Sequence, residues 1–324
     1  MNGLPPYPNG WFRVASSREV GPGAVKPLHY FGRDLVVFRG EDGVAHVLDA
    51  HCPHLGAHLG HGGRVEGGAV RCPFHAWLWN GDGRCLEVPY ATRPPARAAI
   101  RAWPVREVNG LILVYYHARQ EPPDWEIPEL PEYSAPDWTP YRQAHRWTIR
   151  THAQELAENG IDTGHMPLLH RMQTRAIVSE ALDAKGPVLV HRMAHTYNLF
   201  ALSRLIRGDV AGPLEITYYG LGCVVNRAQV RLGIDLNYLF MFLFTPVDEG
   251  HVEVTGVFSM KRVVNGLVTW LLTKKAMQEG GRTIEEDIPI WENKAYRSAP
   301  LLCDGDGPIM RYRQWTRQFY SEPA

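Results

Sequence analysis

The sequence lacks an excess of charge of one sign and lacks a dense set of cysteines. Its 324 residues include 34 lysines and arginines against 34 aspartates and glutamates, so the net charge gives no reason to expect nucleic acid as a partner. Five cysteines are few, and odd in number, for a secreted disulfide framework. We therefore expect a protein of a reducing compartment whose cysteines serve another purpose.

Long apolar segments are also missing. The longest nearly uncharged stretch, residues 236–247, has twelve residues, whereas about 20 are needed to cross a bilayer. Residues 1–13 contain prolines and no apolar run of the kind found in a signal peptide. These observations predict a cytoplasmic protein without a transmembrane segment.

Histidine is abundant by contrast, with fifteen residues, and 45% of the chain is hydrophobic. This composition is that of an ordinary globular protein, and the chain is long enough to bury a large core. Many imidazoles beside a few thiols suggest metal binding.

Two differently patterned regions flank a proline-rich segment. Short apolar runs and glycine-containing turns over residues 34–116 predict antiparallel hairpins. Six prolines within residues 121–140 exclude long regular structure and indicate a surface linker.

Beyond the linker, residues 150–164 and 262–297 have helical patterns, and between them lie long apolar runs typical of strands, at 187–204, 214–231, 235–247 and 251–260. We predict an α+β protein: an all-β domain at 1–118, a linker at 119–140, and a domain built on an antiparallel sheet at 141–324.

The strongest local pattern is a pair of motifs, Cys-x-His and Cys-x₂-His. Cys52 and His54 form the first, and Cys72 and His75, with two residues between them, form the second; seventeen residues separate His54 from Cys72. A Rieske [2Fe–2S] cluster needs two thiolates on one iron and two imidazoles on the other, so two loops that each offer one of each fit it. Glycine and proline beside these residues suit tight loops.

The alternatives are a Cys₂His₂ zinc site or four unrelated residues, but a zinc finger pairs its cysteines in one turn and its histidines in another. We expect His51, His58 and His61 not to be ligands. Ala57 stands where high-potential Rieske proteins carry a disulfide cysteine. The remaining cysteines, Cys85, Cys223 and Cys303, are predicted to be buried free thiols.

A Rieske cluster only moves electrons, so we searched for a second site that could use them. Asp162, His165 and His170 follow one another with the spacing D-x₂-H-x₄-H. On a helix Asp162 and His165 would share a face, and Pro167 would bend the chain so that His170 converges with His165.

Two imidazoles and one carboxylate leave open positions on Fe(II), as in non-haem iron oxygenases. For the carboxylate, Asp287 falls beside an apolar helical stripe formed by Ile284, Ile288 and Trp291, whereas Glu286 is expected to point away from it. A carboxylate on an apolar stripe is costly unless it is paired or bound to metal; an ordinary surface position is the alternative.

Asp162 and Asn159 are candidates for supporting roles. Asp162 could accept the N–H of His165 and so orient the iron site. Asn159, one helical turn earlier, either supports Asp162 or is simply a polar residue at the end of a helix before Gly160.

These motifs resemble those of Rieske non-haem iron oxygenases. The residues that carry the resemblance are 52–63 (CPHLGAHLGHGG), 72–77 (CPFHAW), the N-x₂-D-x₂-H-x₄-H pattern at 159–170, 287–294 (DIPIWENK) and the tail at 304–320. Within the class, the chain is similar to cholesterol 7-desaturases of the Neverland type and then to the α subunits of 3-ketosteroid 9α-hydroxylase. The resemblance covers nearly the whole chain.

The resemblance implies a Rieske domain followed by a helix-grip catalytic domain, in a head-to-tail homotrimer. It implies that Cys52, His54, Cys72 and His75 bind the cluster, and that His165, His170 and Asp287 bind a mononuclear Fe(II) that activates O₂. Electrons from NAD(P)H would arrive through a reductase or ferredoxin and pass from His75 to Asp162 of a neighbouring subunit.

The implied reaction is desaturation or hydroxylation of a C–H bond of an apolar, sterol- or steroid-like substrate. Cholesterol 7-desaturation is the first candidate. The alternatives are 9α-hydroxylation of 3-ketosteroids and oxygenation of another bulky polycyclic molecule. A Rieske electron-transfer protein is the alternative from another class. Some aromatic and aliphatic residues of the strand runs suit an apolar pocket, but core packing explains such a pattern more often, so we do not assign them to the site: Tyr218, Tyr219, Leu239, Phe240, Phe242 and Phe244.

Two features depart from the family pattern. Ala76 replaces the usual glycine after the second cluster histidine, and the N-terminal membrane anchor of animal members is not apparent before Gly10. We therefore expect a soluble enzyme of bacterial style.

Overall fold

Short strands joined by tight turns build the N-terminal part of the chain in the computed structural model, which describes residues 3–170, 174–198, 209–231 and 235–321. The strands form three antiparallel sheets. The first contains β1 (Gly10–Ser16), β10 (Leu111–Tyr116) and β9 (Val105–Val108), the second β2 (Val25–Tyr30), β3 (Arg33–Arg39) and β4 (Ala45–Asp49), and the third β5 (Arg64–Glu66), β6 (Ala69–Arg71), β7 (Leu78–Asn80) and β8 (Cys85–Glu87).

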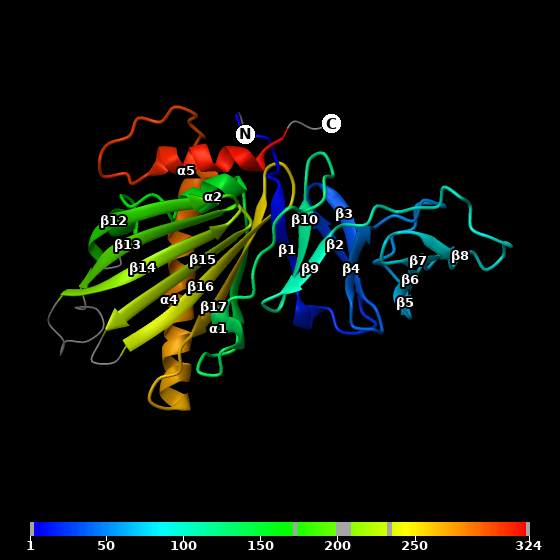
Figure 1. Cartoon of the computed structure of the whole chain (residues 1–324), viewed down its shortest axis with the longest axis horizontal. Helices are drawn as coiled ribbons and strands as arrows, with labels where there is room; N and C mark the ends of the chain where they lie inside the picture. The colour runs from blue at the N-terminus through cyan, green and yellow to red at the C-terminus, as the bar shows by residue number, and fades with distance from the viewer. Residues whose placement is uncertain (1–2, 171–173, 199–208, 232–234, 322–324) are drawn as a thin grey trace.

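The hairpins form where the sequence predicts them. Asn109 and Gly110 join β9 to β10, and both have positive φ, 55° and 71°, as a two-residue type I′ turn requires. The third sheet lies at one end of the molecule, far from the C-terminal part (Figure 1).

The proline-rich segment packs on this β region. It contains the short helix α1 (Pro131–Ser134) and buries Ile127 and Leu130. The Trp11 indole N–H donates to the Trp125 carbonyl at 2.7 Å, so the segment is tied to β1.

A seven-stranded antiparallel sheet dominates the rest of the chain. Its strand order is β11-β17-β16-β15-β14-β13-β12. The strands are β11 (Arg142–Ile149), β12 (Thr174–Lys185), β13 (Val188–Asn198), β14 (Asp209–Tyr219), β15 (Cys223–Arg231), β16 (Asp235–Pro246) and β17 (Val252–Met260). An all-β region followed by helices on an antiparallel sheet confirms the predicted fold class.

Helices cover this sheet on one face and at one end (Figure 1). They are α2 (Ala153–Glu158), α3 (Met166–Leu169), the long α4 (Gly266–Asn293) and α5 (Ile309–Thr316), with 3₁₀ turns at Ser17–Glu19 and Arg317–Phe319. Gly280 and Gly281 let α4 approach the sheet closely, because a Cβ atom at either position would lie 2.1 Å from the Phe240 ring or 2.3 Å from the His145 ring.

Three details differ from the sequence-based prediction. The run 214–231 is two strands, because the chain reverses at residues 220–222, where a Cβ on Gly222 would lie 2.2 Å from the Trp11 carbonyl oxygen. Within the helix predicted over 150–164, only α2 is helical. The strands β11 and β12 were not predicted. The end of the run 187–204 lies outside the described residues.

A buried ion cluster joins the two regions. Arg13 on β1 is 1% exposed and donates to Glu253 on β17 at 3.1 Å and to Glu19 at 2.8 Å. Glu253 also accepts from Tyr30 at 2.9 Å and pairs with Arg146 at 2.5 Å. Since the charges of Arg13 and Glu253 are buried and are compensated mainly by these partners, the cluster fixes how the first sheet sits on the seven-stranded sheet.

We predict that Glu253→Gln lowers the free energy of unfolding by about 3 kcal/mol, because it leaves the buried Arg13 guanidinium short of negative charge. Urea denaturation measures this loss. The control is Asp137→Asn, which removes the exposed ion pair with Lys261 at 3.1 Å and should cost about 1 kcal/mol or less. Equal losses in the two variants would contradict a structural role for the buried cluster.

Candidate metal centres

The Cys-x-His and Cys-x₂-His motifs lie on two loops of the same construction, residues 52–57 and 72–77. In each loop the N–H of the cysteine donates to the carbonyl of the sixth residue, and the N–H of the fifth residue donates back to the cysteine carbonyl, at 2.8 to 3.2 Å. The loops lead into β5 and β7, and they face each other. The chain therefore presents two matched loop tips.

The four predicted cluster ligands converge between these tips. Cys52 and Cys72 are buried, and the rings of His54 and His75 lie 4.5 Å apart between centroids. Burial raises the pKa of Cys52 to about 11, and the neighbouring Cys72 thiol adds to this rise. The Nδ1 atom of His75 is buried without a hydrogen-bond partner in the described part of the chain.

The two adjacent buried thiols and the unpartnered imidazole nitrogen can each donate a lone pair of electrons to a metal. Such a set is costly in a protein interior unless a metal group accepts the lone pairs. The residues thus fit a [2Fe–2S] cluster with thiolates on the core side and imidazoles toward the surface. His54 also stacks on Trp77, with ring centroids 4.7 Å apart, which fixes its ring plane.

Histidines and cysteines outside these loops have other surroundings. His51 is exposed, with Nε2 3.2 Å from an Asp34 carboxylate oxygen, and His58 Nδ1 accepts from the Gly60 N–H.

Cys223 is buried as predicted, but Cys85 is half-buried and Cys303 is exposed, so the prediction was wrong for these two thiols. Cys303 lies in an irregular segment before α5, which offers no core to bury it.

The departure at Ala76 has a conformational cost. Gly56 and Ala76 occupy the same position in the two loops, with φ of 80° and 57°. Glycine adopts this left-handed region freely, whereas a Cβ atom makes it unfavourable by about 1 kcal/mol. The second loop keeps its shape and hydrogen bonds with this strain in place.

Ala76→Gly should therefore raise the free energy of unfolding by about 0.5–1 kcal/mol and leave the visible spectrum of the cluster unchanged. Thermal unfolding of the holoprotein measures the change. Ala57→Gly, in the same pair of loops but at a position without positive φ, is the matched control and should be destabilising. An Ala76→Gly variant that is less stable than the wild type would contradict the proposed strain.

The second site begins where α2 ends. The chain leaves the helix after Glu158, and the Asp162 Oδ1 atom accepts the backbone N–H groups of Gly164 at 2.9 Å and His165 at 3.3 Å. The predicted helical face of Asp162 and His165 is therefore wrong, because a side-chain-capped turn brings them together instead. Pro167 lies in the first turn of α3, where proline is tolerated, and does not kink a helix.

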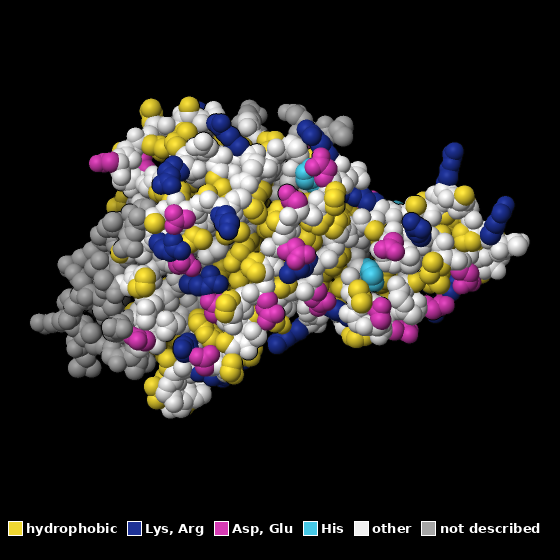
Figure 2. All heavy atoms as spheres, in the orientation of Figure 1, with side chains coloured by type: hydrophobic (Ala, Val, Ile, Leu, Met, Phe, Trp, Pro, Cys, Tyr) yellow, Lys and Arg dark blue, Asp and Glu magenta, His cyan; other side chains and the backbone are white. Residues whose placement is uncertain are grey.

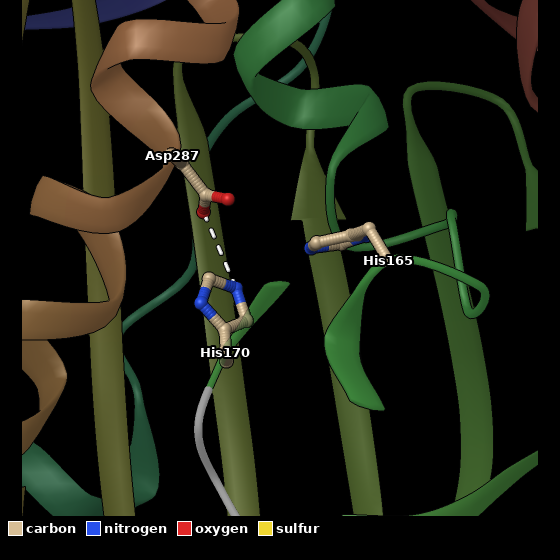
Figure 3. Close-up of side chains that lie close together, drawn as sticks. All are labelled: His165, His170 and Asp287. Atoms are coloured by element: carbon tan, nitrogen blue, oxygen red, sulfur yellow. Dashed lines mark ion pairs between the residues drawn. The ribbon is translucent and has the colours of Figure 1, made fainter. Parts of the chain in front are cut away.

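His165, His170 and Asp287 converge from the two ends of α3 and from α4, as Figure 3 shows. His165 precedes α3, His170 follows it, and Asp287 projects from α4. One potential ligand atom of each lies within 4.8 Å of the others, and His170 Nε2 is 3.5 Å from Asp287 Oδ2. Ile284, Asp287 and Trp291 are all buried along α4, as the helical stripe predicts.

The carboxylate of this site lies in unfavourable surroundings. Burial raises the pKa of Asp287, which is 2% exposed, and the rings of His170 and His165 offset this rise only in part. The Nε2 atom of His165 has no hydrogen-bond partner among the described residues. A buried carboxylate beside an unpartnered imidazole nitrogen fits a bound cation, and two nitrogens with one oxygen suit Fe(II).

Two neighbours hold the ligands in ways that the sequence did not reveal. Asn159 caps the C-terminal end of α2 and donates its Nδ2 hydrogen to Asp287 Oδ2 at 3.0 Å, so it contacts Asp287 and not Asp162. Glu286 was expected to point away, but its Oε2 lies 3.2 Å from His170 Nδ1. The expectation failed because it considered only the apolar stripe of α4, whereas α3 and its flanking residues pack beside that stripe.

Asp162 lies against His165, as predicted, with Oδ2 3.3 Å from Nδ1. Burial raises the pKa of Asp162, but the His165 ring and the two backbone N–H groups outweigh burial and hold the pKa below its ordinary value. Asp162 is therefore a carboxylate at neutral pH and can orient an imidazole that binds metal through its other nitrogen.

Glu286→Gln should weaken Fe(II) binding about 10- to 100-fold, because the charged acceptor for His170 is lost. Titration of the iron-depleted protein with Fe(II) measures the affinity. Glu285→Gln, on the adjacent exposed position of α4, should bind Fe(II) as the wild type does. Equal affinity in the two variants would show that Glu286 does not orient His170.

The chain combines an all-β domain that carries a two-cysteine, two-histidine site with a sheet-and-helix domain that carries two histidines and a carboxylate. This combination defines a Rieske non-haem iron oxygenase. The chain belongs to the family of such oxygenases whose catalytic part is the 3-ketosteroid 9α-hydroxylase C-terminal domain: the Rieske [2Fe-2S] domain family matches residues 10–107, and that C-terminal domain family matches residues 114–320. It is thus an oxidoreductase that uses a [2Fe–2S] cluster, a mononuclear iron and O₂.

Several proteins are similar to this chain over nearly its whole length. Cholesterol 7-desaturase nvd of Bombyx mori is 35% identical over 98% of this chain and 70% of its own length. A probable 3-ketosteroid-9-alpha-monooxygenase oxygenase component of Rhodococcus rhodochrous is 31% identical over 98% of this chain and 82% of its own.

Among solved structures, dicamba monooxygenase bound to dicamba superposes with a TM-score of 0.77 at 20% identity, over 96% of both chains, and so shares the fold. No helix in the described ranges is both long enough and apolar enough to cross a membrane.

Proposed function

We propose that this chain is the oxygenase component of a multi-protein system that oxidises a C–H bond of a sterol or steroid. The convergence of His165, His170 and Asp287 carries the proposal, in a chain whose relatives are named for cholesterol desaturation and 3-ketosteroid hydroxylation. Desaturation at the cholesterol 7-position is the first candidate, and 9α-hydroxylation of a 3-ketosteroid is the second. Electrons come from NAD(P)H through a reductase or ferredoxin.

Each part of the chain has a proposed task. Residues 1–118 form the Rieske domain, with Cys52, His54, Cys72 and His75 as cluster ligands. Residues 119–140 form the linker, and residues 141–324 form the catalytic domain, with His165, His170 and Asp287 as iron ligands.

The side chains around the proposed iron ligands hold them in place. Glu286 holds the ring of His170, Asp162 holds that of His165, and Asn159 holds the Asp287 carboxylate. Iron bound to these ligands would supply dioxygen activation, because two imidazoles and one carboxylate leave coordination positions free. The chain thereby keeps the two imidazoles and the carboxylate together for binding one ion.

We further propose that the active assembly is a head-to-tail homotrimer in which His75 of one subunit faces Asp162 of the next. Within one chain the cluster loops and the iron site lie in different domains, with the first two sheets between them (Figure 1). Leu55 and Phe74 beside the cluster histidines are 64% and 60% exposed. An apolar rim around half-exposed histidines is typical of a surface that docks on another protein.

Turnover with a generic reductase, NADPH and a panel of sterols and steroids tests the proposed substrate class. We expect a product from at least one of them, with a mass loss of two hydrogens for desaturation or a gain of one oxygen for hydroxylation. Asp287→Ala should abolish the product. Failure with every steroid, alongside oxidation of a non-steroid substrate, would overturn the substrate class and leave the enzyme class intact.

Co-expression of Cys72→Ser and His165→Ala subunits tests the proposed subunit contact. Each variant alone should be inactive, but mixed trimers should recover about a third of wild-type activity, because one of the three junctions in such a ring joins an intact cluster to an intact iron site. The mixed trimers are purified through a different tag on each variant in succession and sized by gel filtration. Mixed trimers without activity would contradict electron transfer between subunits.

A further inference from the structure

The first turns of α4 have their apolar side chains on the outside. Thr269 and Thr273 are buried, and their hydroxyl groups donate to backbone carbonyls of Asn265 and Thr269 at 3.0 and 2.8 Å. Leu267, Trp270 and Leu271 on the opposite face are 66%, 43% and 53% exposed. A surface helix ordinarily buries such residues and exposes its threonines, so this segment is inverted relative to the rest of the fold.

Val264, just before the helix, extends the same apolar surface. It is 78% exposed, and its backbone has φ of 46°. A β-branched residue is seldom found in this left-handed region, because its Cβ substituents crowd the backbone. A valine that is both strained and exposed contributes little to folding, which suggests that its side chain is used outside the monomer.

Positive charge surrounds these apolar residues. Lys261, Arg262, Lys274 and Lys275 are exposed, and residues 254–278 contain no aspartate or glutamate. The Lys274 ammonium lies 4.1 Å from the centroid of the Trp270 ring. Lys261 is paired with Asp137, which leaves Arg262, Lys274 and Lys275 as the basic groups around the apolar side chains.

We refer to Val264, Leu267, Trp270, Leu271, Lys274 and Lys275 together as the α4 tip. It lies at the end of the molecule where α4 begins, beyond the edge of the sheet, and hydrophobic side chains reach the surface there (Figures 1 and 2). The position leaves it clear of the cluster loops, which occupy the far end of the other domain.

We propose that the α4 tip docks the enzyme on an anionic lipid surface. Tryptophan and leucine on one helical face suit the boundary between headgroups and acyl chains, and the adjacent lysines suit anionic headgroups. The absence of acidic groups over residues 254–278 favours a lipid surface over a protein partner, since a specific protein interface would use both signs of charge or directional hydrogen bonds. Docking would be peripheral and reversible.

Docking on lipid goes beyond the proposed function, but one consequence of docking rests on that function. A sterol-like substrate resides in membranes, so docking would bring the enzyme to its substrate. Binding itself needs no turnover. The vesicle experiment can therefore fail while the proposed reaction stands, and the reaction can fail while vesicle binding stands.

Flotation of the holoenzyme with vesicles tests the proposal. We expect binding to an equal mixture of phosphatidylcholine and phosphatidylglycerol, and much weaker binding to phosphatidylcholine alone. Trp270→Ser with Leu271→Ser, and separately Lys274→Glu with Lys275→Glu, should each reduce the partition coefficient on mixed vesicles at least about tenfold. Activity on detergent-dispersed substrate should be unchanged in both variants.

The control variant is Leu301→Ser with Leu302→Ser, an exposed apolar pair outside the α4 tip, which should bind vesicles as the wild type does. Wild-type protein that stays unbound would overturn the proposal, as would an equal loss in the control variant. A change in oligomeric state of the α4-tip variants with unchanged vesicle binding would also overturn it, since it would assign the surface to contacts between copies of this chain.

Discussion

The burial of one carboxylate determines how the catalytic half of this protein is arranged. Asp287 lies on the apolar face of α4, almost fully removed from solvent, and its charge is unfavourable there without compensation. His170 reaches it from the end of α3, Asn159 from the end of α2, and His165 from between them. Three short segments that are far from α4 in sequence are thereby held beside it, and their convergence creates the proposed iron site.

The two proposed metal sites are built by different means. The cluster loops are local: within each, two backbone hydrogen bonds close six residues into a tip, and the ligands are almost adjacent in sequence. The iron site is assembled over more than a hundred residues, and it depends on the close approach of α4 to the sheet that Gly280 and Gly281 permit. A substitution in the sheet or in α4 can therefore disturb the iron site without touching a ligand, whereas the cluster site depends mainly on its own loops.

Because the cluster loops are local and the iron site is assembled from distant segments, the sequence predicts the loops more completely than the iron site. The hairpins, the paired loop tips and the buried stripe of α4 are expressed in short-range patterns, and the structure has them where the patterns place them. The turn at Asp162, the contact of Asn159 with Asp287 and that of Glu286 with His170 depend on how separate elements pack, and no spacing rule encodes them. The inverted face of α4 also needed the structure, since Leu267 and Leu271, and likewise Thr269 and Thr273, are four residues apart, a spacing that fits burial of either face.

The count of iron and acid-labile sulfide in the wild type and in His165→Ala tests the central claim, that the chain holds two separate metal sites. The account predicts about three irons and two sulfides per wild-type chain. It predicts about two irons and two sulfides in the variant, with the visible spectrum of the cluster unchanged. A variant that keeps the third iron, or that loses the cluster together with it, would contradict the account.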